Sequence, residues 1–419
     1  MARPAEASAR WVGLRYGAWG FPVAFLALPL YVQLPAHYAQ QFGVSLTAIG
    51  ALLLMARGLD AVIDPWLGRR VDGWMRQSPQ ALWRVMGLAA VVMAIGFAAL
   101  FLPSPQGQSK VYWLGWCSLA LLPTMLAYSL ASIGHQGWGA QLGGAPAKQA
   151  HIVAWREACG LAGVVSASVL PAVLGWPAMV AVLALSLALG WWLLRQAPAP
   201  DMTTSPSQAN ATQPWQHRGF RRLLAVFALN GIASAIPATL VLFFVADRLQ
   251  ATAWSPLFLG SYFLAAALGL PVWVRLVSRW GLVRAWALGM ALSVASFAFA
   301  WLLGPGDTSG FLIVCLASGL ALGADLALPS ALLATTLPAR DAAGAYFGWW
   351  NGVAKLNLAL AAGLALPLLE WGGYTPGARS DTALLALSSA YCLLPCALKL
   401  AALLALWRFA PFTPVKELP

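Results

Sequence analysis

The chain has 419 residues, of which 60% are hydrophobic and only 9% are charged. A soluble protein carries about 25% charged residues, so this composition excludes a soluble globular domain and indicates an integral membrane protein. The net charge of +12 could indicate nucleic-acid binding. The basic residues recur in alternate loops instead of forming one basic domain, however, so we expect no nucleic-acid partner.

Apolar segments recur along the whole chain, and each is long enough to cross a bilayer as a helix of about 20 residues. The twelve segments cover residues 17–38, 46–66, 83–103, 110–140, 150–174, 177–196, 220–246, 254–276, 283–303, 309–336, 342–370 and 382–409. The sequence therefore predicts an all-α integral membrane protein with twelve transmembrane helices. Basic residues gather in the even-numbered connections, as at Arg69, Arg70 and Arg76. The positive-inside rule then predicts that both termini lie in the cytoplasm. We expect a multi-pass protein of the cell inner membrane.

A polar stretch divides the chain in two. Residues 197–219 are rich in Pro, Ser, Thr, Gln and Asn, a composition that cannot support a packed core. We expect a six-helix half over residues 1–196, a cytoplasmic linker over 197–219 and a second six-helix half over 220–419. Two parallel halves with substrate bound between them at mid-membrane are typical of the major facilitator fold.

The second apolar segment carries charges that a spanning helix normally lacks. Asp60 and Asp64 are four residues apart, which places both carboxylates on one helical face, and Arg57 lies one turn before Asp60. Each ionisable side chain at the bilayer centre costs roughly 2.5–3.5 kcal/mol, and such residues usually line an ion or substrate path. One interpretation is therefore an ion site. The other is a structural Arg–Asp lock, with Asp72 closing a cytoplasmic clamp.

The pattern Arg57-x-x-Asp60-Ala61-x-x-Asp64-Pro65-x-x-Gly68-x-x-x-Asp72 resembles the helix 2 signature of the glycoside–pentoside–hexuronide cation symporters of the major facilitator superfamily. The resemblance continues in order along the chain. Its further matches are Tyr128-Ser129 with Trp138 on the fourth helix, Arg156 on the fifth, Lys355 on the eleventh, and Gly373 to Pro376. It implies that Asp60, Asp64 and Ser129 bind the coupling cation.

Two departures from that family bear on the ion and the solute. Sodium-using members often carry an Asn just before the second acid, where this chain has Ile63, so a proton is favoured over sodium as the coupling ion. The positions that match the family's sugar-binding acids hold Pro22 and Ser132, which argues against a melibiose-like galactoside. We expect no cofactor and no metal site.

Substrate contacts are expected at Trp138, Arg156, Trp350 and Asn351. Tryptophan can stack on a sugar ring or an acyl chain, and arginine suits the capture of an anionic group. Arg156 with Glu157 could be a substrate clamp or an internal salt bridge, although Glu157 is expected to face elsewhere on the helix.

Charge coupling is assigned to Arg57, Lys355 and Asp325. Lys355 could pair with Asp60 or Asp64, or snorkel to the membrane surface. Asp325 could be a second ion or substrate ligand, or a packing acid satisfied by Asn230 or by backbone. We expect Lys399 to snorkel.

The sequence thus predicts a secondary transporter that moves a glycoside or similar polar organic solute by alternating access, coupled to a cation. Two other hypotheses stay open. One is a transporter of lysolipids or other amphipathic lipids on the same fold, and the other is a membrane receptor or scaffold that does not transport. An enzyme is not expected, because we find no nucleophile–base pair. A small-molecule substrate and the lipid bilayer are the expected partners, and no particular protein partner is indicated.

Overall fold

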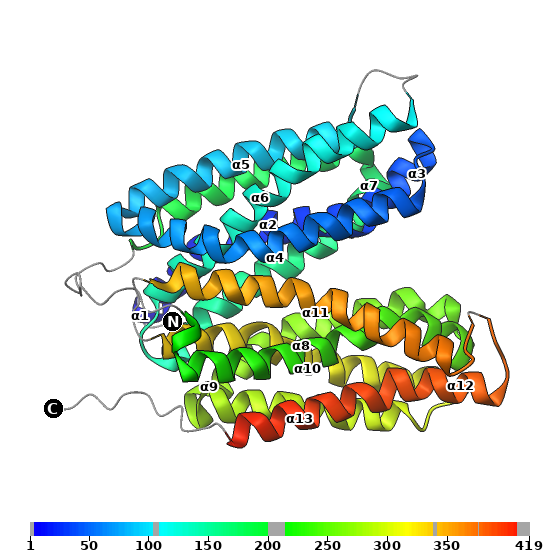
Figure 1. Cartoon of the computed structure of the whole chain (residues 1–419). Coiled ribbons are helices and arrows are strands. Elements are labelled where there is room, and N and C mark those ends of the chain that lie inside the picture. Colours follow the sequence, from blue (N-terminus) through cyan, green and yellow to red (C-terminus); the bar gives the residue numbers. More distant parts are fainter. Residues whose placement is uncertain (1–3, 104–108, 200–213, 338–341, 376, 409–419) are drawn as a thin grey trace. The chain divides into compact units, whose positions relative to one another are not determined.

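The computed structural model describes residues 4–103, 109–199, 214–337, 342–375 and 377–408 (Figure 1). These residues form helices and turns and no β-strand, so the predicted all-α class is confirmed. They group into two compact units. Unit 1 comprises Met1–Gly144, His151–Ala211 and Pro338–Gly352, and unit 2 comprises Ala145–Ala150, Thr212–Leu337 and Val353–Pro419. The predicted division at residues 197–219 stays a prediction, since residues 200–213 lie outside the described part.

Unit 1 is built mainly from the helices before the linker. They are α1 (Pro4–Gly17), α2 (Gly20–Leu28), η1 (Pro29–Gln33), α3 (Leu34–Phe42), α4 (Leu46–Gln77), α5 (Pro79–Phe101), α6 (Lys110–Leu142) and most of α7 (Pro146–Arg195). The π-helical turn η1 joins α2 and α3 into one continuous span. The first turns of α11, up to Gly352, also belong to this unit.

Unit 2 contains the helices after the linker. They are η2 (Pro214–Gln216), α8 (Arg218–Phe243), η3 (Phe244–Arg248), η4 (Thr252–Trp254), α9 (Ser255–Ala300), α10 (Thr308–Thr336), α11 (Ala343–Trp371), α12 (Asp381–Ser388), η6 (Ser389–Leu393) and α13 (Leu394–Arg408). Its core is aromatic. The ring of Phe244 stacks on that of Tyr391 with their centres 4.2 Å apart, and Phe311 packs against Phe258 at 4.9 Å.

Serine side chains fix the starts of several helices. The hydroxyl oxygens of Ser45, Ser78 and Ser109 accept the backbone N–H groups of the residues three positions later, at 3.0–3.2 Å. Such N-caps satisfy donors that have no partner within the helix, and each stabilises the helix by about 1 kcal/mol.

The two longest helices turn a corner at a glycine. Gly175 in α7 and Gly281 in α9 have φ values of 77° and 78°, a left-handed conformation that glycine adopts without steric cost. As one straight rod, the 46 residues of α9 would run about 70 Å, more than twice the hydrocarbon thickness of a bilayer. Each helix therefore supplies two spans, here called its first and second legs. With these four legs, the described helices make the predicted twelve spans.

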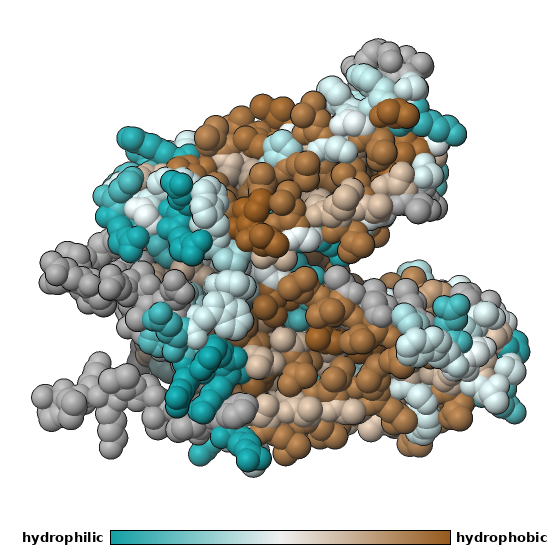
Figure 2. Space-filling model, in the orientation of Figure 1, coloured by the Kyte–Doolittle hydropathy of each residue, from teal (hydrophilic) through white to brown (hydrophobic). Residues whose placement is uncertain are grey.

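Hydrophobic side chains cover the sides of the helices in each unit, and hydrophilic ones gather at the helix ends (Figure 2). Eight helices among the described residues are long and apolar enough to cross a membrane by composition alone. The charged helix α4 is not one of these eight, although its 32 residues exceed the length of a span. Its charges mark it as the element to examine for function.

Candidate functional site

The acids of α4 are withdrawn from solvent. The side chains of Asp60 and Asp64 are 2% and 0% exposed, and both lie on the buried face of the helix. Helix α4 contacts α6 within unit 1. On α6, Ser129 is 1% exposed. The structure thus places the three residues predicted to bind a cation on two contacting helices in unit 1, all of them buried. Their role as cation ligands stays a prediction.

A tyrosine that the sequence analysis missed joins this group. The guanidinium carbon of Arg57 lies 4.2 Å from the ring centre of Tyr31, in the range of a cation–π contact. Tyr31 thereby contacts the arginine that lies one turn before Asp60. It lies in the π-helical turn η1, and such turns are frequent at functional sites. Its sequence signal is a single tyrosine two residues after Pro29 in an apolar run, which is too weak to select it.

Helix α11 packs closely against α4, and glycines lie at the points of contact. A Cβ atom at Gly68 would lie 2.1 Å from the carbonyl oxygen of Gly344. One at Gly348 would lie 2.5 Å from that of Asp64. Small residues four positions apart let membrane helices pack at backbone contact. The backbone that carries Asp64 is therefore in direct contact with α11.

Asp72 fastens the beginning of α11. Its two carboxylate oxygens accept hydrogen bonds from the backbone nitrogens of Gly344 and Ala345, at 2.6 and 2.8 Å. A carboxylate at a helix N-terminus meets both unsatisfied N–H groups and the positive end of the helix dipole. This contact supports the clamp that was predicted for Asp72.

Two of the predicted substrate residues lie on α11. The side-chain amide of Asn351 exchanges hydrogen bonds with that of Gln136 on α6, at 2.9 and 3.2 Å. Asn351 also donates to the carbonyl of Phe347. The neighbouring Trp350 is 3% exposed. Both residues are within unit 1, and Asn351 faces α6 there.

The other two predicted substrate residues lie elsewhere in unit 1. The indole nitrogen of Trp138 donates to the carbonyl of Pro198, which places this ring at the end of α6 nearest the linker. The Arg156 guanidinium donates twice to Glu157 Oε1, at 3.0 and 2.5 Å. The expectation that Glu157 faces elsewhere is thus wrong, because the two side chains are long enough to meet beside the helix. The internal salt bridge is the alternative that the structure supports.

In unit 2, Lys399 is not at the surface. The expectation that it snorkels is wrong, since the residue is 1% exposed. Its ammonium donates to Asp325 Oδ2 at 2.8 Å, to Asn230 Oδ1 at 2.9 Å and to Ser234 Oγ at 3.0 Å. An ammonium has three N–H donors, so these three acceptors satisfy all of them. Acceptors on α8 and α10 therefore keep Lys399 inside the protein.

Asp325 is held equally firmly. Besides Lys399, its carboxylate accepts from the hydroxyl of Ser234 at 3.1 Å and from the indole nitrogen of Trp286 at 3.0 Å. Both a ligand and a packing acid were open for Asp325, and in the structure this residue forms an ion pair with Lys399. Lys355 on α11 is half-buried, and its predicted pairing with Asp60 or Asp64 stays a prediction.

The twelve spans, the buried charges and the apolar flanks define a multi-pass membrane transporter of the major facilitator type. The chain belongs to the MFS/sugar transport protein family, which it matches over residues 15–411. The predicted fold is thereby confirmed. No curated protein sequence matches the chain significantly.

Several solved structures share this fold. A bacterial homologue of the iron transporter ferroportin in an outward-facing state is 16% identical, with a TM-score of 0.72 over 95% of this chain and 99% of that one. The proton:xylose symporter XylE, bound to 6-bromo-6-deoxy-D-glucose, is 15% identical, with a TM-score of 0.64 over 96% and 95% of the two chains. FucP in the outward conformation is 12% identical, with a TM-score of 0.67 over 94% and 98%. At these identities the likeness defines the fold alone.

Proposed function

We propose that this chain is a cation-coupled symporter of the glycoside–pentoside–hexuronide type. In this proposal it moves a glycoside or similar polar organic solute across the cell inner membrane by alternating access, with both termini in the cytoplasm. The observation that carries the proposal is the burial of Asp60 and Asp64 one turn apart on a spanning helix. Two buried carboxylates at this spacing are expensive in a membrane and mark ion paths.

Charge balance supports a monovalent coupling ion. Arg57, Asp60 and Asp64 together carry one net negative charge when all are ionised. Binding of one proton or one sodium ion makes this set of three neutral, which favours its burial. Ile63 supplies no oxygen ligand beside the second acid, so we favour the proton. Lys355 remains the proposed residue that couples this charge to the rest of the transport cycle.

Family membership and residues near α4 and α6 support the proposed solute class. A sugar-transport family makes a polyhydroxylated solute the first candidate. The side-chain amides of Gln136 and Asn351 exchange hydrogen bonds with each other. Each amide can replace this partner with a hydroxyl group of the solute. Arg156, Trp138 and Trp350 are the other proposed contacts, for which Arg156 would have to leave Glu157.

Reconstituted proteoliposomes test the coupling directly. Wild type is compared with Asp64→Asn for uptake of radiolabelled sugars, driven by an inward proton gradient or an inward sodium gradient. We expect the proton gradient to drive accumulation in wild type and not in Asp64→Asn. The variant should still exchange labelled for unlabelled solute across the membrane without net accumulation, because exchange needs no cycling of the ion. Preserved exchange also shows that the variant is folded.

The controls separate the alternatives. Asp381→Asn removes an exposed acid at the start of α12 and should leave uptake unchanged. Accumulation driven by sodium alone would overturn the choice of the proton. Transfer of a lysophospholipid, increasing with chain length, in the absence of any sugar uptake would favour the lipid hypothesis. Absence of all transport, with ligand-dependent changes in tryptophan fluorescence, would favour the receptor.

A further inference from the structure

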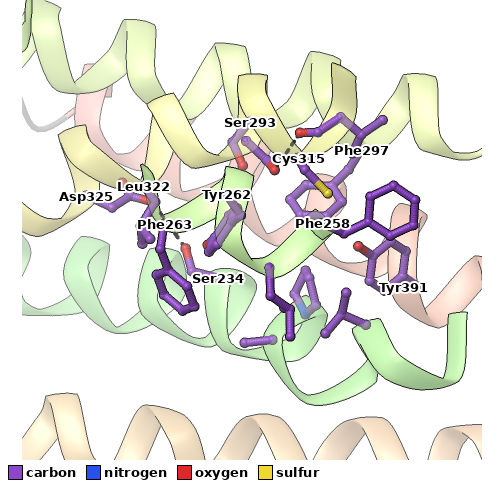
Figure 3. A pocket seen from close by; sticks show the side chains of 16 residues that line it. Ser234, Phe258, Tyr262, Phe263, Ser293, Phe297, Cys315, Leu322, Asp325 and Tyr391 are labelled. Carbon is purple, nitrogen blue, oxygen red and sulfur yellow. Dashed lines mark hydrogen bonds between the residues drawn. The ribbon is translucent and has the colours of Figure 1, made fainter. Parts of the chain in front are cut away.

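Unit 2 contains a partly open cavity of about 130 Å³, and no residue of α4 lines it. Residues of α8, both legs of α9, α10 and η6 line it. In Figure 3 the rings of Phe258, Phe297 and Tyr391 lie toward one end of the cavity, and Asp325 lies at the other, hydrogen-bonded to Ser234. A cavity needs only about 10–15 Å³ to hold a water molecule, so this one has room for a small solute.

The polar end of this cavity contains a complete ion pair and carries no net charge. Asp325 lines the cavity and is 10% exposed, while Lys399 pairs with it from α13 at 2.8 Å. Ser234 bonds to both charged groups. Because the ion pair carries no net charge, a positively charged ligand would leave an uncompensated charge in an apolar wall, which is strongly unfavourable. A neutral ligand carries no such penalty.

The hydrogen-bonding capacity of Asp325 is not exhausted. A carboxylate offers about four acceptor positions, and Lys399, Ser234 and Trp286 occupy three of them. The remaining position can accept one hydroxyl from a ligand. Ser293, 4% exposed, adds a hydroxyl to the cavity lining. Aromatic rings on the walls suit the apolar faces of a ring-shaped ligand.

We propose that this cavity binds a small neutral polyhydroxylated solute, with Asp325 and Ser293 hydrogen-bonding its hydroxyl groups and the aromatic walls contacting its carbon skeleton. The solute class rests on the proposed function, but the site is separate from the residues of α4. The cavity gives unit 2 a binding site of its own.

A cysteine inside the cavity reports its occupancy. Cys315 lines the cavity and is a free thiol. The wild-type protein in liposomes is treated with N-ethylmaleimide, and alkylation of each cysteine is followed by peptide mass spectrometry. The probes are D-xylose, D-glucose, methyl β-D-galactoside and mannitol, with choline as a cationic probe. We expect at least one neutral probe to slow alkylation of Cys315 at least fivefold, with no effect on the partly buried Cys159 of unit 1 and none from choline.

A pair of serine variants tests the geometry. Ser293→Ala removes a hydroxyl from the cavity wall, and we expect the probe concentration for half-protection to rise about tenfold, the effect of one lost hydrogen bond. Ser296→Ala is the matched control on the same leg of α9, because its hydroxyl donates to the carbonyl of Leu292 and the residue does not line the cavity. It should leave protection unchanged.

Several results would overturn the proposal. They are protection by choline, protection by no neutral probe, equal effects of the two serine variants, and a Cys315 that is never alkylated. Uptake in the proteoliposome assay without protection of Cys315 would reject this cavity and leave the proposed function standing. Protection of Cys315 without any uptake would reject the proposed function and leave the cavity.

Discussion

The carboxylate of Asp72 holds the backbone nitrogen of Gly344 at 2.6 Å, although 272 residues separate them in the chain. Its second oxygen accepts the N–H of Ala345. A side chain on α4 therefore caps α11, so the first turn of α11 depends on a residue far away in the sequence. The same two helices also approach closely at Gly68 and Gly348.

Asp72→Asn should destabilise the protein. An amide can accept only one of the two hydrogen bonds well, and it loses the attraction of a negative charge to the helix dipole. We expect a loss of about 1–2 kcal/mol, read as a lower Tm in detergent. Asp381→Asn, which changes an exposed acid, should shift stability by less than about 0.5 kcal/mol. Equal Tm values for Asp72→Asn and wild type would contradict the capping role.

Gly68→Ala should destabilise the protein although it adds only one methyl group. The added Cβ would lie 2.1 Å from the carbonyl oxygen of Gly344, so α11 must move away from α4. Overpacking of this kind costs about 1–3 kcal/mol. Gly73→Ala on the same helix is the control, because a Cβ there meets nothing within 4 Å. The control should be neutral or slightly stabilising, since alanine is the better helix former. Equal Tm values for Gly68→Ala and Gly73→Ala would refute the prediction.

The ion pair of unit 2 should show strong coupling in a double-mutant cycle. Asp325→Asn or Lys399→Met alone leaves a buried charge without its partner, at a cost of about 3–5 kcal/mol. The double variant removes both charges, so we expect it to be more stable than either single variant. Chemical unfolding of the four proteins in detergent measures the coupling energy.

The control for this cycle is the exposed partner of another ion pair. Arg379, whose side chain is 52% exposed, lies 4.0 Å from Asp247. Asp247 is buried, but its carboxylate also accepts hydrogen bonds from the Tyr374 hydroxyl and the backbone nitrogen of Gly377. Because these partners remain and Arg379 itself is exposed, Arg379→Met should cost less than either single variant of the Asp325–Lys399 pair. Strictly additive losses at Asp325 and Lys399 would show that the pair does not act as a unit.

The aromatic ring of Tyr31 should contribute to the stability of the protein. Tyr31→Phe keeps the aromatic face beneath Arg57, and Tyr31→Leu removes it. We expect the leucine variant to lose about 0.5–2 kcal/mol relative to the phenylalanine variant, the range of cation–π contacts. Trp66→Leu removes the exposed ring under Arg70 and should lose less. Similar Tm values for the two Tyr31 variants would assign the role of this residue to its hydroxyl instead.

Local sequence patterns predicted the features that depend on a single helix. The four-residue spacing of Asp60 and Asp64 predicted a shared face, and the structure buries both. The predicted position of Lys399 was wrong because its three acceptors come from α8 and α10. No local sequence pattern indicates a partner 74 to 169 positions away. Tyr31 was missed because its turn deviates from the ordinary helical period. Pairing between helices is therefore the part that sequence patterns alone did not supply.

The corner at Gly281 ties two walls of the unit 2 cavity together. Phe258 and Tyr262 come from the first leg of α9, and Ser293 and Phe297 come from the second, so both walls belong to one continuous helical hairpin. No loop lies between the legs, so the spacing of these walls depends on the backbone at a single residue. Because Gly281 has a φ of 78°, a side chain placed there would strain the corner and disturb the cavity wall.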